Sequence, residues 1–498
     1  MPSFDVPRDI WLHISQFIPP HDLRNLYAVN SAFFDVAMKL RYETLSVDEL
    51  SDASITQLSR LGDPMVASRV RTLLFRPHHR FNAKQEREVV RNMFITSFLG
   101  AYHHFFTPFR FSSQKEGSAK KARDSSMSLL ETTTKIFTKQ LPKFTNVTEF
   151  RIDTWNIPLT FDLQPLLSTA WASFGKTLRV LSLGGNMQSF QVFAESSPYL
   201  VSLDELTLEF TNNLFRIDKP QDIASLLKFA PCINSFNLRS LTIFSWSSQD
   251  LSKFFLSLGP FPRLEKFCIR TAFNKAFRST DAAGLSRLLA NTPTLTHVEL
   301  KLRPIGSALD QHTEDALVQW LAQTSSSSTV LTALHTLHIY PTMFPLGLEA
   351  TKRYIERSSL TLRWLSLRDR YFWLNEVEDL LDALGPDHSL TALQMNVQVL
   401  SGELLDYLSS RLPSLRKLKL SIGAIRSESA EREEQFNPNR FRFHMQGRRY
   451  RSWLIEDIDL SQGGAKLDMR FMDLLAECIP SVTSYWGQGF KGTAVPYD

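Results

Sequence analysis

Apolar residues recur along most of the chain in one short pattern: an apolar residue, two spacers, a second apolar residue, one spacer and a third. The clearest copy is LRVLSL, with Leu178, Leu181 and Leu183. Further copies place their apolar residues at Leu203, Leu206, Leu208; Leu238, Leu241, Ile243; Leu264, Phe267, Ile269; Leu295, Val298, Leu300; Leu334, Leu337, Ile339; Leu362, Leu365, Leu367; Leu390, Leu393, Met395; Leu415, Leu418, Leu420; and Ile455, Ile458, Leu460. Residues two apart share one face of a strand. Each copy therefore predicts a strand that buries one face, and ten copies predict a repeat protein.

Amphipathic helical patterns follow these strand patterns, for example in residues 281–291, 375–384 and 402–412. Strand, helix and strand at so short a period require parallel strands with right-handed crossovers. The sequence therefore predicts an α/β leucine-rich-repeat solenoid, with parallel strands on the concave face and helices outside. A helical HEAT-like array is the alternative, and the strand pattern before each helix disfavours it.

Changes in composition along the chain predict its organisation. Residues 1–41 form a compact helical region, and residues 42–142 begin the repeat array with a helical insertion and a mobile loop at 112–126. Residues 143–486 continue the solenoid, interrupted by a charged insertion at 426–451, and residues 487–498 form a tail. Both insertions are polar and lack the apolar spacing that the repeats need.

The first forty residues predict three short helices. Pro7 and Asp9 suit a helix start, Pro19 and Pro20 end that helix, and Asp22 caps the next. So small a unit buries too little apolar surface to be stable alone, and we expect it to pack on a neighbour or a partner. The order of its residues resembles an F-box: Val6-Pro7, Asp9-Ile10, Ile14, Phe17-Ile18-Pro19, Asp22-Leu23, Leu26, Val29, Ser31 and Phe33. Phe33 stands where that motif most often has tryptophan.

This resemblance implies that the region docks on the Skp adaptor of a cullin-RING ubiquitin ligase, and that the repeats hold a protein substrate. The chain is then the substrate receptor of an SCF-type E3 ligase and is not itself an enzyme. The adaptor-binding residues predicted from the motif and its excess apolar surface are Pro7, Ile10, Ile14, Leu23, Leu26 and Val29. A helical cap that covers the first repeat, in a repeat scaffold without a ligase role, is the alternative.

Bulk composition fits a folded protein of the cytoplasm or nucleus. The formal net charge is +5 over 498 residues, too small for a nucleic-acid coat protein. Three widely spaced cysteines exclude a disulfide framework and a cysteine-based zinc site. We expect no signal peptide, since the first residues lack its pattern, and no membrane span, since no apolar run approaches ~20 residues. No catalytic or phosphate-binding motif appears in its required context, so we expect no metal and no cofactor.

The spacers of the strand patterns are the candidates for binding a substrate. From the middle of the array onwards they are mostly basic or aromatic, with Glu299 as the acidic exception. The predicted substrate-binding residues are Lys266, Arg270, His297, Lys301, Tyr340, Trp364 and Arg368. Standing in a row, they predict a groove for an acidic or phosphorylated segment. An ordinary solvated strand face is the alternative, and the basic run at 440–451 leaves a nucleic-acid-associated protein as a further one.

Overall fold

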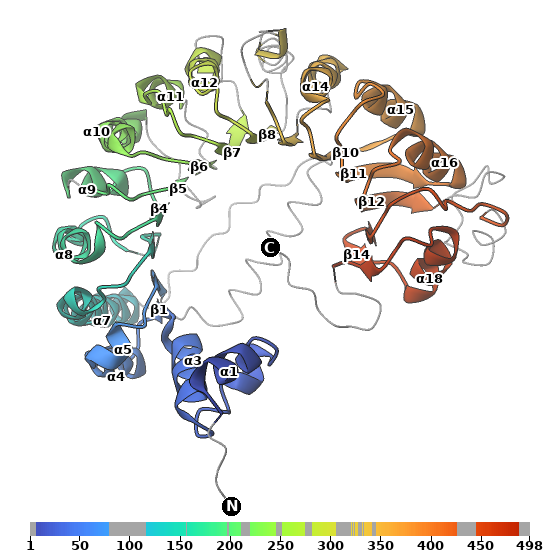
Figure 1. Cartoon of the computed structure of the whole chain (residues 1–498). Coiled ribbons are helices and arrows are strands. Elements are labelled where there is room, and N and C mark those ends of the chain that lie inside the picture. The colour runs from blue at the N-terminus through green and yellow to red at the C-terminus, as the bar shows by residue number, and fades with distance from the viewer. Residues whose placement is uncertain are drawn as a thin grey trace, which may run out of the picture. The chain divides into compact units, whose positions relative to one another are not determined.

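The computed structural model describes residues 6–78, 116–155, 157–196, 199–210, 220–245, 251–273, 281–304, 320, 322, 324–326, 331, 333–340, 345–425 and 445–487. The chain forms two compact units, of which unit 1 is Met1–Leu238 with Phe244–Gln249 and unit 2 is Arg239–Ile243 with Asp250–Asp498. Strands alternate with helices in each unit (Figure 1).

Unit 1 begins with three helices and continues as strand–helix repeats. Its elements are α1 (Arg8–Ser15), α2 (Pro20–Leu23), α3 (Ser31–Tyr42), β1 (Thr44–Glu49), α4 (Asp52–Arg60), α5 (Pro64–Ala67), β2 (Thr72–His78), α7 (Glu116–Gln140), β3 (Glu149–Asp153), α8 (Gln164–Phe174), β4 (Val180–Gly185), α9 (Ser189–Glu195), β5 (Glu205–Phe210) and α10 (Ile223–Ser235). Short 3-10 turns lie at Leu141–Lys143 and Pro220–Asp222. Strands β1 to β5 pair in sequence order, and every pair is parallel.

The repeat pattern of the sequence becomes a ladder of buried side chains in unit 1. Leu45 pairs with Leu73, Leu73 with Phe150, Phe150 with Leu181, and Leu181 with Leu206. All five side chains are buried. Each repeat thus covers the apolar face of its neighbour, which no single repeat could bury alone.

Helix α7 corrects the predicted loop at 112–126. It runs from Glu116 to Gln140, so residues 116–126 are helical, while residues 112–115 lie outside the described part of the chain. The prediction relied on the lack of apolar residues, but Ala119, Lys120, Lys121 and Ala122 are strong helix formers. Helix propensity here outweighs the missing apolar face. The predicted helical insertion before residue 112 also lies outside the described residues.

Unit 2 repeats the same alternation. Its elements are α11 (Ser252–Ser257), β7 (Lys266–Phe273), α12 (Asp281–Ala290), β8 (His297–Pro304), β9 (Thr336–Ile339), α14 (Pro345–Ser358), β10 (Trp364–Phe372), α15 (Leu374–Asp382), β11 (Ala392–Leu400), α16 (Gly402–Arg411), β12 (Lys417–Ile425), β13 (Asp457–Gln462), β14 (Ala465–Lys466), α18 (Met469–Cys478) and β15 (Ser484–Tyr485). Strand β6 (Ser240–Ser245) contains residues of both units.

Strands β7 to β13 of unit 2 pair in sequence order, all parallel, and β15 adds a further parallel pair with β13. The short strand β14 pairs with β13 antiparallel. One row of the ladder consists of Phe267, Val298, Leu337, Leu365, Leu393, Leu418, Ile458 and Tyr485, all of them buried. The predicted α/β fold of leucine-rich-repeat type, with parallel strands, is therefore confirmed.

Candidate functional site

Exposed apolar side chains are frequent in the three helices at the start of unit 1 and in the segments that flank and connect them. This N-terminal apolar surface consists of Val6, Ile10, Leu12, Ile14, Phe17, Tyr27, Val29 and Phe34. Phe17 alone keeps 75% of its surface exposed. Large apolar side chains scattered singly on a surface are ordinary, but eight between Val6 and Phe34 indicate an interface.

The packing of these helices decides which predicted adaptor-binding residues reach the surface. Pro7, Ile10, Ile14 and Val29 are exposed, and Leu26 is half-buried. Leu23 is only 4% exposed, so its side chain holds the helices together instead of lying on the surface. The sequence pattern cannot separate these two roles, because apolar residues at helical spacing occur on buried and on docking faces alike.

An aromatic pair and a cap fix the interior of the three-helix unit. The ring of Trp11 meets that of buried Phe33 edge to face, with centroids 5.3 Å apart. Asn30 caps α3, since its Oδ1 accepts a hydrogen bond from the Phe33 backbone N–H at 2.8 Å. With phenylalanine at position 33, the small core therefore keeps an aromatic anchor.

Asp35 ties the three-helix unit to the first repeat. Its carboxylate lies 2.5 Å from Arg8 of α1 and 2.8 Å from Arg69, which follows α5. Arg69 also donates to the Asp35 backbone carbonyl at 3.2 Å. Because α3 ends at Tyr42 and β1 begins at Thr44, little chain separates the two parts. The three-helix unit is thus joined to the first repeat by a short connection and by the Arg69–Asp35 contacts.

The second candidate surface is the spacer face of unit 2, meaning the side of strands β7 to β13 that carries the spacers. Strand register aligns Lys266 with His297 and Arg270 with Lys301. Lys266, Arg270, His297, Trp364 and Arg368 are exposed, whereas Lys301 is half-buried and Tyr340 is buried. The register thus aligns four of the seven predicted residues in two pairs, and the seven differ in accessibility.

Glu299 pairs with two basic residues of that row, Arg270 and Lys301. Its carboxylate accepts a hydrogen bond from Arg270 Nε at 2.7 Å, forms an ion pair with Lys301, and lies 3.7 Å from His338. Burial opposes its ionisation, but the hydrogen bonds from His338, Arg270 and Lys301 outweigh burial and lower the pKa of Glu299. Lys301 also lies over the Tyr340 ring, 5.1 Å from its centroid. These cations are therefore engaged within the protein.

In unit 1, spacer positions of strands β3 and β5 carry acidic residues. Asp153 pairs in register with Gly184, and Gly184 with Glu209, so a glycine lies between two carboxylates. Arg76 lies 3.0 Å from Asp153. Burial raises the pKa of Glu209, the nearby Asp153 raises it further, and Arg76 partly offsets both. A Cβ at Gly184 would lie 2.4 Å from Asp153 Oδ1, so a larger residue here would displace the Asp153 carboxylate.

The basic segment at 440–451 is only partly described. Residues 426–444 lie outside the described part of the chain. In the described remainder, Arg448 Nε lies 3.0 Å from Asp406 and the Tyr450 hydroxyl donates to the same carboxylate at 2.7 Å. Arg449 donates to the Glu477 backbone carbonyl at 2.7 Å. These contacts occupy side chains that a nucleic-acid site would have used.

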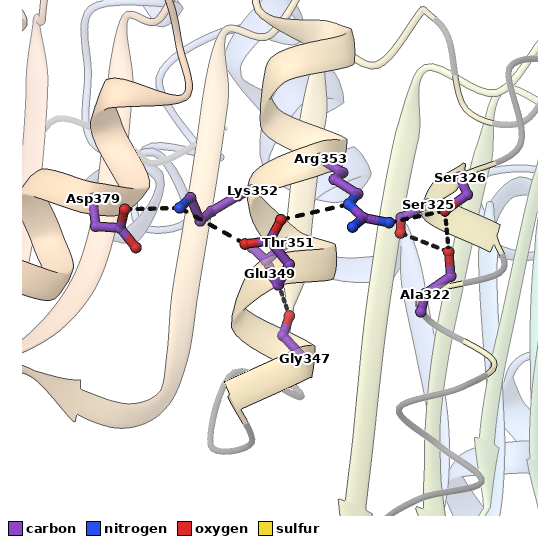
Figure 2. Close-up of polar contacts among 9 residues, drawn as sticks. All are labelled: Ala322, Ser325, Ser326, Gly347, Glu349, Thr351, Lys352, Arg353 and Asp379. Carbon is purple, nitrogen blue, oxygen red and sulfur yellow. Dashed lines mark hydrogen bonds and ion pairs between the residues drawn. The ribbon is translucent and has the colours of Figure 1, made fainter.

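The helix side of unit 2 offers ion pairs between neighbouring helices. Lys352 of α14 lies 2.7 Å from Asp379 of α15 and 3.8 Å from Glu349. Arg353 lies 3.6 Å from Glu349 and donates to Ser326 Oγ at 3.0 Å (Figure 2). Lys352 and Arg353 thus have partners within the protein, which makes the surface of α14 and α15 a weak candidate for binding a charged ligand.

Two kinds of site find no support among the described residues. No group of three or more histidine, cysteine, aspartate or glutamate side chains there is arranged to hold a metal ion. None of the described helices is both long and apolar enough to cross a membrane.

Comparison with known proteins yields fold neighbours only. No family model matches the chain, and no curated protein matches it. The chain is similar to the solved structure of the leucine-rich repeat-containing protein LegL7 from Legionella pneumophila, at 15% identity and a TM-score of 0.37, over 69% of this chain and 96% of that one. It is also similar to the yeast complex of Rad7 and Elc1, at 15% identity and a TM-score of 0.39, over 78% and 96%. At these TM-scores the fold assignment rests on the strand register described above.

Proposed function

We propose that this chain is the substrate receptor of an SCF-type ubiquitin ligase. Its three-helix unit binds the Skp adaptor, its repeats bind a protein substrate, and ubiquitin transfer takes place elsewhere in the complex. The chain itself catalyses no reaction in this proposal, and it acts in the cytoplasm or nucleus.

The N-terminal apolar surface carries the proposal. Four of the six residues predicted from the F-box resemblance, Pro7, Ile10, Ile14 and Val29, lie exposed in the free chain. An apolar surface of this kind is stabilised by a partner that removes it from water. The Asp35 contacts also support the proposal, because they join the adaptor-binding unit to the first repeat of unit 1.

Co-purification from cells tests this function. Ile10 is 46% exposed, so docking would bury about half of its side chain, worth about 1 kcal/mol. A carboxylate at the same place adds several kcal/mol of desolvation cost. We therefore expect Ile10→Asp with Val29→Asp to lose the adaptor and the cullin.

Met65→Asp is the matched control, because Met65 is exposed on α5, outside the three helices. It should keep both partners. An Ile10→Asp, Val29→Asp chain that captures adaptor and cullin at the wild-type level would contradict the proposal and favour a repeat scaffold without a ligase role. Capture of nucleic acid instead, weakened by salt, would favour the nucleic-acid alternative.

A further inference from the structure

Strand β10 carries a bulge that interrupts the regular repeat. Leu367 pairs with Met395 and Phe372 pairs with Val397, so residues 368–371 of β10 face the single residue Asn396 of β11. Bulges redirect side chains and break the pairing of a sheet locally, and they occur often beside functional sites.

Several contacts hold this bulge in one conformation. Asn396 Nδ2 donates to the Arg368 backbone carbonyl at 2.9 Å. Arg370 forms two hydrogen bonds with Glu376 of α15, at 3.0 and 2.7 Å, and its guanidinium lies 4.6 Å from the centroid of the Phe372 ring. Glu376 in turn accepts from the Trp373 backbone N–H at 3.0 Å. A bulge pinned at both ends presents its side chains without a large entropy cost on binding.

The bulge presents the residue types that dominate binding energy at protein interfaces. Trp364 is 43% exposed at the start of β10, Trp373 is 48% exposed just after its end, and Tyr371 and Arg368 are exposed between them. Tryptophan, tyrosine and arginine are the side chains enriched at such positions. A Cβ at Gly423 of β12 would lie 3.4 Å from Tyr371 Cδ1, an ordinary van der Waals distance, so the Tyr371 ring lies beside β12.

The strands beside the bulge add hydrogen-bonding groups and positive charge. Gln394 of β11 accepts a hydrogen bond from Ser366 through Oε1 at 3.2 Å, and its amide nitrogen has no protein partner among the described residues. Within the residues that the structure describes, Arg368 and the exposed Lys417 form no ion pair. This part of the spacer face therefore differs from the Glu299 cluster, whose cations are already paired.

We propose that the bulge surface, defined as Trp364, Arg368, Tyr371, Gln394 and Lys417, binds an extended acidic segment of a protein substrate. Arg368 and Lys417 pair with carboxylates of the segment, Gln394 bonds to its backbone, and the aromatic rings cover an apolar side chain. The inference rests on the receptor function proposed above. The proposed site leaves out Arg270 and Lys301, two of the residues predicted from the sequence, because both are paired with Glu299.

Peptide is favoured over nucleic acid because of strand β13. Its spacers Asp457 and Asp459 lie in register beside Lys417 and Lys419 of β12, and Lys419 is 2.5 Å from Asp459. A continuous phosphate backbone laid across these strands would meet both carboxylates, whereas a short peptide can place its acids at Arg368 and Lys417 alone.

Selection from a library of random 12-residue peptides displayed on phage tests the proposal on the full-length chain. We expect enriched peptides to carry an excess of aspartate and glutamate together with an aromatic or large apolar residue. The most enriched peptide, synthesised with a fluorophore, is then titrated by fluorescence anisotropy. Arg368→Glu and, separately, Lys417→Glu should each weaken its binding at least tenfold, which corresponds to about 1.4 kcal/mol.

Arg287→Glu is the matched control, since Arg287 is an exposed arginine on helix α12. It should change the affinity less than twofold, and thermal unfolding curves of all variants should match. The proposal is overturned if no peptide is enriched, if enriched peptides lack the acidic excess, or if both reversals bind as the wild type does. Tighter binding of a fluorescent 12-nucleotide uridine oligomer, lost in Arg368→Glu, would overturn it in favour of nucleic acid.

Adaptor binding, measured on the same proteins, separates this proposal from the receptor function. Arg368→Glu should leave adaptor binding unchanged. A wild-type chain that binds the acidic peptide but no adaptor would contradict the ligase role and support the peptide site on the bulge surface. A wild-type chain that binds the adaptor but no acidic peptide would support the ligase role and contradict the peptide site.

Discussion

Glu299→Gln removes the carboxylate that holds Arg270, Lys301 and His338 together on the spacer face. The change keeps the size of the side chain and deletes its charge. Glu299 and Lys301 are only 17% and 15% exposed, whereas Arg270 is 48% exposed. Removal of one partner from a buried ion pair costs about 3–5 kcal/mol, and an exposed pair contributes about 0–1 kcal/mol. For this partly buried cluster we expect a loss of roughly 2–3 kcal/mol, between the two cases.

Thermal unfolding at neutral pH measures this loss. For a unit of this size, a change of 1 kcal/mol shifts the Tm by about 2–4 °C, so Glu299→Gln should lower it by about 4–12 °C. The matched control is Glu265→Gln. Glu265 accepts hydrogen bonds from Arg239 at 2.9 and 3.1 Å, but both side chains are about half exposed. The same substitution there should shift the Tm much less.

The pH dependence gives a second, independent check. Because the folded-state pKa of Glu299 lies below its value of about 4.3 in the unfolded chain, its contribution to stability is complete above about pH 5 and declines as the pH falls. The Tm difference between wild type and Glu299→Gln should therefore narrow from pH 5 downwards. A Tm loss no larger than that of Glu265→Gln, or a Tm difference that does not change down to pH 3, would show that Glu299 does not stabilise this cluster.

The remaining predictions concern three other places in the chain. Leu23→Asp should unfold the three-helix unit, seen as lost protection in hydrogen exchange, while Ile10→Asp leaves protection intact; equal protection in both would contradict the packing described. Gly185→Ala should destabilise unit 1, because its Cβ would lie 1.9 Å from Thr154 Oγ1, and an unchanged urea midpoint would show that the neighbouring strands relax freely. Burial and the nearby Glu299 raise the pKa of Cys268 to about 12, so this thiol should stay unlabelled by iodoacetamide at pH 8 until urea is added, as mass mapping would reveal.

The strand positions were predictable because the information that sets them is local. An apolar residue at every second position is buried on one face whatever the neighbouring repeat contributes, and Leu181 and Leu393 follow this rule. Parallel pairing followed from the short helical connections, since no other connection fits between the strands.

Side-chain partners between repeats were harder to predict. The sequence places Glu299 among basic spacers, but only the register between β7, β8 and β9 brings it within reach of Arg270 and His338. The basic row predicted from alternation is therefore partly neutralised. The sequence does show Glu299 as the one acid in that row. The residues that it contacts on neighbouring strands, however, cannot be deduced from the spacing within its own strand.

The bulge of β10 was missed because it breaks the rule that revealed the strands. After Leu367 the apolar alternation stops for four residues and resumes at Phe372. Such an irregularity resembles the start of a loop, and the sequence alone does not show that Asn396 and Glu376 hold it in place. The aromatic residues Tyr371, Phe372 and Trp373 in succession were the available signal.

Calorimetric titration of the purified full-length chain with purified Skp adaptor tests adaptor binding without other cellular proteins. We expect saturable binding of one adaptor per chain, abolished by Ile10→Asp with Val29→Asp and retained in Met65→Asp. Absence of binding by a chain with an intact unfolding transition, or equal binding by all three proteins, would contradict it.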